Sequence, residues 1–549
     1  MGLIGLATIA GLLLSIPGAA AAQVPKPLDR AACAGLAGFN IRAGMIGLPT
    51  LGASVTSAVV TPSSGSGPAA IPEHCLVTGE IRPVDPQAPN IEFKVALPIQ
   101  WNGKVVMFGG GGTNGVIPNV TGGALNTDGA VTPLGRGYAV FGSDSGHQGP
   151  GASFALNREA HLNYLGDALK KTRDAAMFIV RKSYGRAATR AYFMGTSSGG
   201  REALVVAGRW PTDWDGVVSL YPARNTTVLD LGLVAANQVL AAPGAFPNPA
   251  KRTVAYRAAL AACDGLDGIK DGIISNLAGC YGAFRLESST LDGAPVRCPN
   301  GADTGDACLS DAQLLALRKL DGPVEFGYTL ANGESSFPGA NVLTSDSGTP
   351  ASSQLSYGSA PPKGATPYPG MSILTALAWE WARHMVTRDA SYNALELDVT
   401  KPGRFAERLQ DLSAFDTADR DLTGFAKRGG KVLLLHGTDD LLISARLTER
   451  YYGQLKETLE PAALAEMVRY YQVPGFGHSR GATFVMAWDQ LTALENWVEK
   501  GVDPANSQVG VDTVGVPGRT RPLCVYPTWP RYRGAGDVNK AASFSCATK

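Results

Sequence analysis

The stretch Gly195-Thr196-Ser197-Ser198-Gly199 joins a predicted strand to a predicted helix. Residues 191–194 are apolar and aromatic, as in a short buried strand, and residues 201–208 have helical character. A serine on a tight turn between a strand and a helix is typical of a nucleophile elbow, which exposes the hydroxyl beside a base and backbone donors. Small neighbours suit this turn because its strained backbone excludes bulk. The competing interpretation is a plain Gly/Ser loop, since the chain contains 67 glycines.

Short β-branched or aromatic runs alternate with helical stretches on both sides of this turn. The predicted strands are 92–97, 104–108, 138–142, 190–194, 216–220, 432–435 and 469–473, and the predicted amphipathic helices are 160–184 and 483–500. This alternation predicts an α/β fold whose mostly parallel sheet is covered on both faces. Ligands of such sheets bind at the carboxyl ends of the strands.

A long insertion interrupts the alternation. Residues 224–428 are rich in Gly, Pro, Ser and Thr, and we predict a lid domain that covers the strand ends and builds the substrate pocket. Residues 23–223 and 429–549 then form the catalytic domain, and the alternative is an independent accessory domain. Within the insertion, Trp379 and Trp381 offer surface for a flat acyl group and Arg383 a carboxylate partner. The alternative is that the two tryptophans belong to the lid core.

Two further stretches supply partners for Ser197. The apolar run 432–435 leads into Asp439 and Asp440, and an acid there can hold the tautomer of an imidazole. Asp440 is preferred because it lies farther into the loop. His478 follows the next predicted strand and is the only one of the six histidines that comes after the acid. The order Ser, Asp, His is that of α/β-hydrolases.

A glycine run, residues 109–112, follows the predicted strand 104–108. Glycines let backbone N–H groups approach an oxyanion, and the N–H of Ser198 would be the second donor. The rival is a phosphate-binding loop, but the run lacks the Lys-Ser/Thr pair and the spacing of dinucleotide motifs.

An acidic loop lies in the insertion between Cys263 and Cys280. Asp264, Asp267 and Asp271 alternate with glycines, and oxygen ligands on a curved loop suit calcium. The alternative is a solvated acidic turn, because no glutamate closes an EF-hand.

The whole chain excludes some classes of protein. It has 549 residues with 48 Lys plus Arg against 47 Asp plus Glu, a net charge of +1, and no basic stripe for nucleic acid. Residues 3–16 are apolar and are followed by small residues, which predicts a signal peptide over residues 1–22 cut before Gln23. The run is too short to span a membrane, so we expect a secreted or periplasmic protein without a membrane partner.

The cysteine content agrees with export. The chain has an even number of cysteines, none in a C-x-x-C motif. Eight cysteines allow 105 pairings. Taken in order they give four local loops: Cys33–Cys75, Cys263–Cys280, Cys298–Cys308 and Cys524–Cys546.

Together these motifs resemble the tannase and feruloyl esterase family of secreted α/β-hydrolases over nearly the whole mature chain. The stretches that carry the resemblance are 72–75, 109–115, 195–202, 263–273, 436–440, 474–478, 519–524, 531–532 and Cys546. The resemblance implies Ser197 as nucleophile, Asp440 as orienting acid and His478 as base. It implies Gly112 and Ser198 as oxyanion donors and supports the four local disulfides. It also implies a structural calcium ion held by Asp264, Asp267 and Asp271 with the carbonyls of Ile269 and Ile273.

The chain departs from the family at two positions. Members typically carry a cysteine just before the nucleophile and another just after the catalytic histidine, joined as a disulfide. Here these positions are Thr196 and Ser479, so both partners are absent together. We expect packing and hydroxyl hydrogen bonds to hold the site instead.

The sequence therefore predicts a secreted serine carboxylesterase that hydrolyses esters of aromatic, hydroxycinnamate-like acids through an acyl-enzyme, with no redox cofactor. Gallate esters and terephthalate monoesters are the alternative substrates. Rival functions are an amidase or peptidase with the same triad and a secreted binding protein whose site has decayed.

Overall fold

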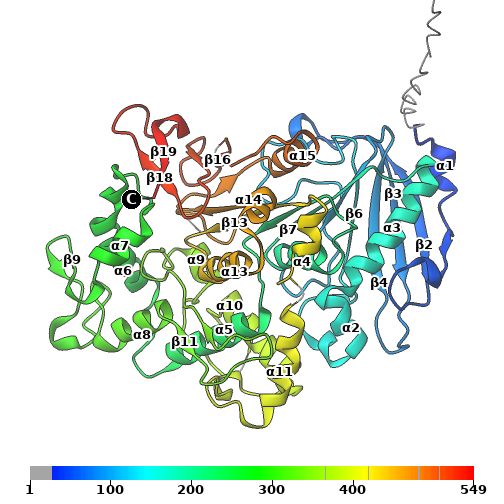
Figure 1. The fold of residues 1–549 in the computed structure, drawn as a ribbon. Helices are drawn as coiled ribbons and strands as arrows, with labels where there is room; N and C mark the ends of the chain where they lie inside the picture. The colour runs from blue at the N-terminus through cyan, green and yellow to red at the C-terminus, as the bar shows by residue number, and fades with distance from the viewer. Residues whose placement is uncertain (1–26, 365, 418, 480–482, 506, 549) are drawn as a thin grey trace, which may run out of the picture.

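A twisted ten-stranded sheet forms the centre of the computed structural model (Figure 1), which describes residues 27–364, 366–417, 419–479, 483–505 and 507–548. The predicted signal peptide lies outside these residues. In spatial order the strands are β1 Asn40–Ile41, β2 Ala53–Thr61, β3 His74–Ile81, β4 Ile91–Pro98, β6 Ala139–Ser143, β5 Lys104–Phe108, β7 Arg190–Thr196, β8 Gly216–Leu220, β13 Lys431–Gly437 and β14 Val468–Val473.

The strands from β6 to β14 pair in parallel, as the alternation of strands and helices predicts. At the other edge β1, β2, β3, β4 and β6 pair antiparallel, and β1 to β3 were not predicted from the sequence. In β3 the side chains alternate between buried and partly exposed positions. That period of two is the signal of a half-solvated antiparallel strand.

Helices cover both faces of the parallel part, because successive strand residues point to opposite sides. Val105 and Met107 pack with α3 Ala168–Tyr184 and α4 Ser198–Arg209, whereas Val106 and Phe108 pack with α15 Gln490–Lys500. Further helices beside the sheet are α1 Arg30–Ala34, α12 Thr423–Lys427, α13 Ala445–Thr458 and α14 Pro461–Met467. The mostly parallel α/β fold is thereby confirmed.

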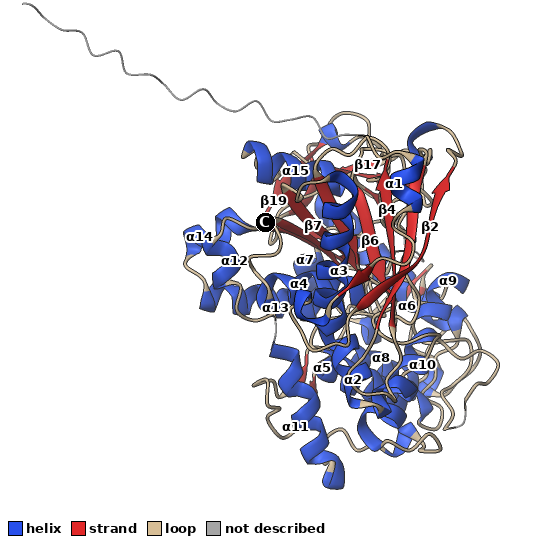
Figure 2. Ribbon diagram, turned by 90° about the vertical axis from the view of Figure 1, so that its right-hand side faces the viewer, coloured by secondary structure: helices blue, strands red, loops and turns tan. Residues whose placement is uncertain are grey.

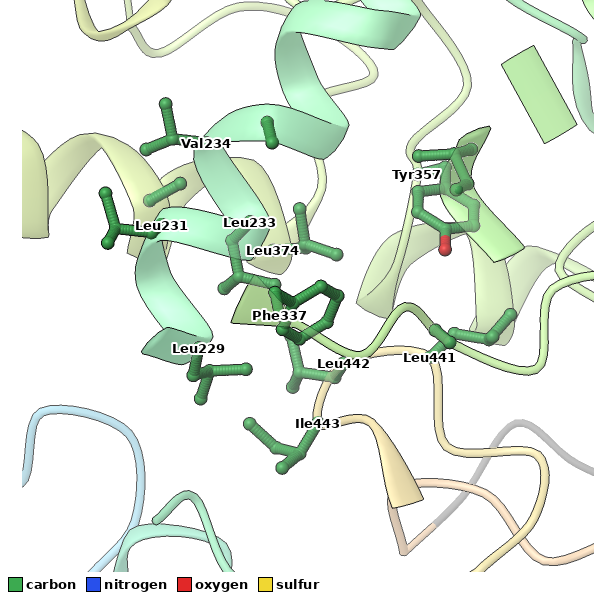
Figure 3. Packing of buried hydrophobic residues seen from close by; sticks show 14 of the residues in the cluster. Leu229, Leu231, Leu233, Val234, Phe337, Tyr357, Leu374, Leu441, Leu442 and Ile443 are labelled. Atoms are coloured by element: carbon green, nitrogen blue, oxygen red, sulfur yellow. The ribbon is translucent and has the colours of Figure 1, made fainter. Parts of the chain in front are cut away.

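The chain between β8 and β13 folds into a largely helical layer next to the sheet (Figures 1 and 2). Its helices are α5 Thr226–Ala241, α6 Pro249–Cys263, α7 Leu277–Ala283, α8 Asp311–Asp321, α9 Pro350–Leu355, α10 Ile373–Glu380 and α11 Ala406–Ala414, with short hairpins β9 Thr290–Leu291, β10 Ala294–Pro295, β11 Val324–Glu325 and β12 Ser336–Phe337. Leu229 and Leu233 of α5 pack in one apolar cluster with Leu442 and Ile443, which follow β13 (Figure 3). The insertion is therefore packed directly against the loop that ends a central strand.

The predicted helix 160–184 is broken in the structure. It forms α2 Arg158–Leu162, an irregular turn Asn163–Asp167 and α3, with Gly166 at φ 149°. A Cβ at Gly166 would lie 2.9 Å from Val205 of α4, so the close approach of α4 requires glycine there. The kink turns His161 and Tyr164 toward the cavity described below.

The predicted helix 483–500 begins later than expected. Only α15 is helical, and Met486–Ala487 forms β15, which pairs with β16 Val509–Asp512. The reason is that Phe484 and Met486 are fully buried in the sheet-face cluster, where an extended segment fits. The C-terminal segment adds β17 Thr520–Pro522, β18 Trp529–Tyr532 and β19 Phe544–Ala547.

All eight cysteines are paired in the order that the sequence suggested. The disulfides are Cys33–Cys75, Cys263–Cys280, Cys298–Cys308 and Cys524–Cys546, which confirms the four local loops. Among the described residues, no helix is both long and apolar enough to cross a membrane.

Candidate active site

Ser197 occupies the turn between β7 and α4. Its backbone has φ 58° and ψ −122°, a strained conformation for a residue with a side chain. The turn is held because Ser197 N–H donates to the Leu220 carbonyl at 3.0 Å and the Ser197 carbonyl accepts from Ala223 N–H at 3.0 Å. A Cβ at Gly195 would lie 2.0 Å from the Gly199 carbonyl oxygen, so the turn cannot close without that glycine.

The structure brings His478 and Asp440 to Ser197 in hydrogen-bonding succession. His478 Nε2 lies 3.0 Å from Ser197 Oγ, and His478 Nδ1 lies 2.7 Å from Asp440 Oδ2. The Asp440 carboxylate is buried and accepts two backbone N–H bonds, from Leu442 at 3.0 Å and Ile443 at 2.9 Å. Asp440, and not its neighbour Asp439, therefore faces the imidazole.

A second histidine, His436, also contacts the acid. Its Nε2 lies 3.3 Å from Asp440 Oδ2 and 2.9 Å from the Ile443 carbonyl, while Nδ1 lies 2.8 Å from Thr448 Oγ1. These partners assign the proton to Nε2. Burial alone would raise the pKa of Asp440, but the charges and hydrogen bonds of the two histidines outweigh it and hold that pKa well below its usual value. Sequence reasoning gave His436 no role, because its contact with Asp440 depends on how the loop after β13 curls.

The loops that carry the acid and the base are bonded to each other. Thr438 N–H donates to the Val473 carbonyl at 2.9 Å, and Asp439 N–H donates to the Phe476 carbonyl at 3.0 Å. At Gly437 a Cβ would lie 1.9 Å from the Phe476 carbonyl oxygen. This close contact sets the position of His478 relative to Asp440.

The glycine run after β5 lies against the first turn of α4. Gly199 N–H donates to the Gly110 carbonyl at 2.8 Å, and the Ser198 hydroxyl donates to the Gly112 carbonyl. Buried Glu202 accepts from Gly110 N–H at 3.0 Å and from the Asn114 amide. These two hydrogen bonds hold the glycine run in place against α4. Gly112 and Ser198 both line the cavity at Ser197, at the N-terminus of α4, where backbone N–H groups favour negative charge.

A cavity of about 580 Å³ opens at Ser197 and His478. Of the three residues predicted from the insertion, only Trp381 lines it. Trp379 is 1% exposed and its indole N–H donates to the Lys363 carbonyl at 3.1 Å. The Arg383 guanidinium donates to the carbonyls of Tyr392 and Gly364 and to the Thr366 hydroxyl. Trp379 is thus buried inside the insertion, and the Arg383 guanidinium is bonded to other residues of the insertion and not to the cavity.

The acidic loop has two carboxylates turned toward its own backbone. Asp264 accepts from the N–H groups of Asp271 and Gly272, and Asp271 forms an ion pair with Arg521. Asp267 Oδ2 is buried without a hydrogen-bond partner, and burial raises the pKa of Asp267 to about 6. No group of three or more His, Cys, Asp or Glu side chains in the described part of the chain is arranged to hold a metal ion. The unpartnered oxygen nevertheless fits an all-oxygen site for a hard cation.

Comparison with known proteins identifies the family. The sequence profile described as "Tannase and feruloyl esterase" matches residues 75–547. The chain belongs to the tannase and feruloyl esterase family. An uncharacterized esterase of Agrobacterium fabrum is 39% identical over 94% of this chain and 93% of the relative. Mono(2-hydroxyethyl) terephthalate hydrolase of Piscinibacter sakaiensis is 32% identical over 87% of this chain and 85% of its own length.

Solved structures agree on the fold. The crystal structure of feruloyl esterase B from Aspergillus oryzae has a TM-score of 0.75 at 23% identity, covering 94% of this chain and all of that chain. A tannin acyl hydrolase from Aspergillus niger has a TM-score of 0.67 at 19% identity, covering 96% of each chain. These structures show that the fold is that of an α/β-hydrolase. The family match and the esterase relatives show that this tannase-family member is a carboxylic ester hydrolase.

Tyr221 occupies the region between the two positions where this tannase-family chain has no cysteine. The hydroxyls of Thr196 and Ser479 face the Tyr221 side chain, whose pKa is raised by burial and lowered in part by these two hydroxyls. The Tyr221 hydroxyl donates to Asn126 Oδ1 at 2.7 Å. Sequence reasoning missed Tyr221; its place directly after the strand β8 was the available signal.

Proposed function

We propose that the protein is a secreted serine carboxylesterase that hydrolyses esters of hydroxycinnamate-like aromatic acids through an acyl-enzyme. The observation that carries the proposal is the succession Ser197 Oγ, His478 Nε2, His478 Nδ1 and Asp440 Oδ2, with contacts of 3.0 and 2.7 Å, at the mouth of a largely apolar cavity. Several relatives are named probable feruloyl esterases, which supports the choice of acyl group.

In the proposed reaction His478 takes the proton from Ser197 as its oxygen attacks the ester carbonyl. The N–H groups of Gly112 and Ser198 would stabilise the oxyanion, a contribution of about 2.7–4 kcal/mol for one such donor. His478 then protonates the leaving alcohol and activates water for deacylation. Asp440, ionised because its pKa is lowered, would stabilise the imidazolium in both steps.

A burst experiment tests this mechanism. We expect p-nitrophenyl butyrate to give a burst of p-nitrophenol equal to the enzyme concentration and Ser197→Ala to give none, with an unchanged melting temperature. A matched ester and anilide pair separates an esterase from an amidase. No Ser197-dependent turnover of any ester would leave a decayed binding protein as the better reading.

The terephthalate monoester is the second candidate substrate. It is favoured by the 32% identity to mono(2-hydroxyethyl) terephthalate hydrolase over most of both chains. A comparison of methyl ferulate, methyl gallate and a terephthalate monoester ranks the candidates by kcat/KM.

We also propose that the acidic loop binds calcium in a structural role. Asp264, Asp267 and Asp271 with the carbonyls of Ile269 and Ile273 would hold the ion once the Asp264 and Asp271 side chains turn from their present partners. The ion would neutralise the Asp264 and Asp267 carboxylates, whose ionised forms burial otherwise disfavours. Thorough chelation is expected to lower the melting temperature by several degrees, and re-added calcium to restore it; an unchanged melting curve would rule out the ion.

The four disulfides support export to an oxidising compartment. N-terminal sequencing of the mature protein is expected to begin at Gln23, and retention of Met1 would contradict a cleaved signal peptide.

A further inference from the structure

Most of the cavity wall beyond Ser197 is apolar. Leu229 and Leu233 of α5 and the neighbouring Leu442 and Ile443 all line it (Figure 3), as does Trp381. Among the described residues, no lysine or arginine side chain lines this cavity. An aromatic acyl group therefore finds apolar surface but no direct cationic partner.

His161 and Asp230 are among the polar side chains that line the cavity and have no part in the proposed reaction. His161, on α2, is 6% exposed, and its Nε2 is buried without a hydrogen-bond partner. Asp230, on α5 between Leu229 and Leu233, lines the same cavity, and no hydrogen bond or ion pair joins its carboxyl to any residue that the structure describes. The buried His161 Nε2 and the partly exposed Asp230 carboxyl therefore have hydrogen-bonding capacity to offer a ligand in the cavity.

Burial disfavours the charged form of both groups. Burial, together with the charges of Arg408, Arg201 and Arg388, lowers the pKa of His161 to about 4. Burial also raises the pKa of Asp230 well above its usual value, with the nearby charge of Asp416 adding to the effect.

The nearby charged groups are already engaged elsewhere. Arg201 donates to the Tyr164 carbonyl, Arg388 to the Leu156 carbonyl and Arg408 to the Met385 carbonyl. Asp416 accepts from the N–H groups of Thr226 and Thr227. The cavity wall thus offers a carboxyl group whose protonated form burial favours and an imidazole whose neutral form burial favours.

We infer that His161 and Asp230 bind an uncharged hydroxyl on the acyl group, and that this cavity selects phenolic acyl esters over acyl groups that bear a carboxylate. The inference rests on the proposed function and adds its specificity. A hydroxyl both donates and accepts, as these two partners require. A carboxylate would be desolvated there with no lysine or arginine in the described lining to bond it directly, which is costly. A site built to bind a hydroxyl also discriminates against the analogue that lacks it.

The test compares methyl p-coumarate, methyl cinnamate and monomethyl terephthalate, with p-nitrophenyl acetate as a reference whose acyl group is too small to reach His161 and Asp230. We expect wild-type kcat/KM for methyl p-coumarate to exceed that for the other two methyl esters by at least about tenfold. His161→Phe and Asp230→Leu should each remove most of the preference over methyl cinnamate. Neither should change p-nitrophenyl acetate turnover more than about twofold.

Asp128→Asn is the matched control, because Asp128 lines the same cavity but is exposed, and it should keep the preference. Asp230→Ala, which also lacks a hydrogen-bonding group, serves if Asp230→Leu fails to fold. A wild-type preference for monomethyl terephthalate would overturn the inference, as would equal losses on p-coumarate and cinnamate in the variants. Absence of Ser197-dependent turnover of p-nitrophenyl acetate would instead overturn the proposed function.

Discussion

The ring of Tyr221 packs edge-on against the imidazole of His478, with ring centroids 4.8 Å apart. Its hydroxyl is bonded to Asn126 and lies beside Thr196 and Ser479. Tyr221 therefore connects the strand that ends at the nucleophile to the loop that carries the base.

We expect Tyr221→Phe to lower kcat by about tenfold with little change in KM, because the retained ring keeps its packing while the hydroxyl contacts are lost. Steady-state kinetics on p-nitrophenyl butyrate and a melting curve measure the two effects. Adding Thr196→Cys and Ser479→Cys in the same background should recover part of the loss once the disulfide forms. Unchanged kcat in Tyr221→Phe would remove Tyr221 as a positioning residue.

Asp439, next to the orienting acid, titrates differently from it. Burial raises the pKa of Asp439 from 3.8 to about 7, despite the hydrogen bond from Thr438. Between pH 3.8 and about pH 7, the Asp439 carboxyl therefore keeps its proton in the folded protein and loses it in the unfolded chain. Its stabilising contribution is fully present below pH 3.8 and is lost as the pH rises through 7.

Asp439→Asn removes this titration and keeps an acceptor for the Thr438 hydroxyl. The melting temperature of the variant relative to wild type should therefore rise between pH 5 and pH 8, by roughly a few degrees. Calorimetry at the two pH values measures it. A difference that does not vary with pH would show that Asp439 is ionised throughout.

At the scale of elements, the nucleophile elbow depends on glycines that allow β7, α4 and the loop after β5 to meet. Gly195→Ala would place a methyl group 2.0 Å from the Gly199 carbonyl oxygen. We expect at least about a hundredfold loss of kcat/KM, because the turn must open and move Ser197. Gly453→Ala in α13, where no heavy atom lies within 4 Å, is the control that should keep full activity. Wild-type activity in Gly195→Ala would mean that the turn tolerates bulk.

The sequence predicted the parallel strands well because their apolar runs are continuous and bounded by glycine, proline and polar residues. Strands β5 and β8 have the predicted limits. The antiparallel edge was missed because half-solvated strands show only weak alternation. The break at Gly166 was missed because helical periodicity continues across it, and its cause, contact with Val205, is tertiary.

Among site residues, the sequence could nominate the groups that follow strands, since the topology of parallel sheets gathers them at one edge. It could not nominate His161 or Asp230, because their positions depend on how a broken helix and the insertion pack together. The predicted role of Arg383 as a carboxylate partner fails for the same reason. An arginine on a helix rich in aromatic residues can bond within the lid or face the cavity, and only its partners in the folded structure decide which.

At the scale of the whole molecule, one buried ion pair ties together the two connections of the insertion. Arg224, just after β8, pairs with Asp419 through contacts of 2.8 and 3.1 Å, and both side chains are buried. The Arg224 guanidinium also lies 4.2 Å from the ring centroid of Tyr451 on α13. The ion pair thus holds the segment where the chain enters the insertion next to the segment where it leaves, and the contact with Tyr451 holds both against α13.

Arg224→Met should lower the free energy of unfolding by about 3–5 kcal/mol, because Asp419 would be left buried without its counter-charge. Urea denaturation measures this loss. The double variant Arg224→Met/Asp419→Leu should be more stable than the single variant, since the orphaned charge is gone. A single variant as stable as wild type would mean that water reaches Asp419.

The four bridges follow a rule of nearest neighbours: each joins one cysteine to the next along the chain, at separations of 42, 17, 10 and 22 residues. A polypeptide threaded from its amino end through a translocation channel presents its thiols in that same order. An oxidase that joins each emerging cysteine to the next unpaired one would form all four native disulfides without later rearrangement. Production in a host that lacks a disulfide-shuffling enzyme should therefore yield correctly bridged protein.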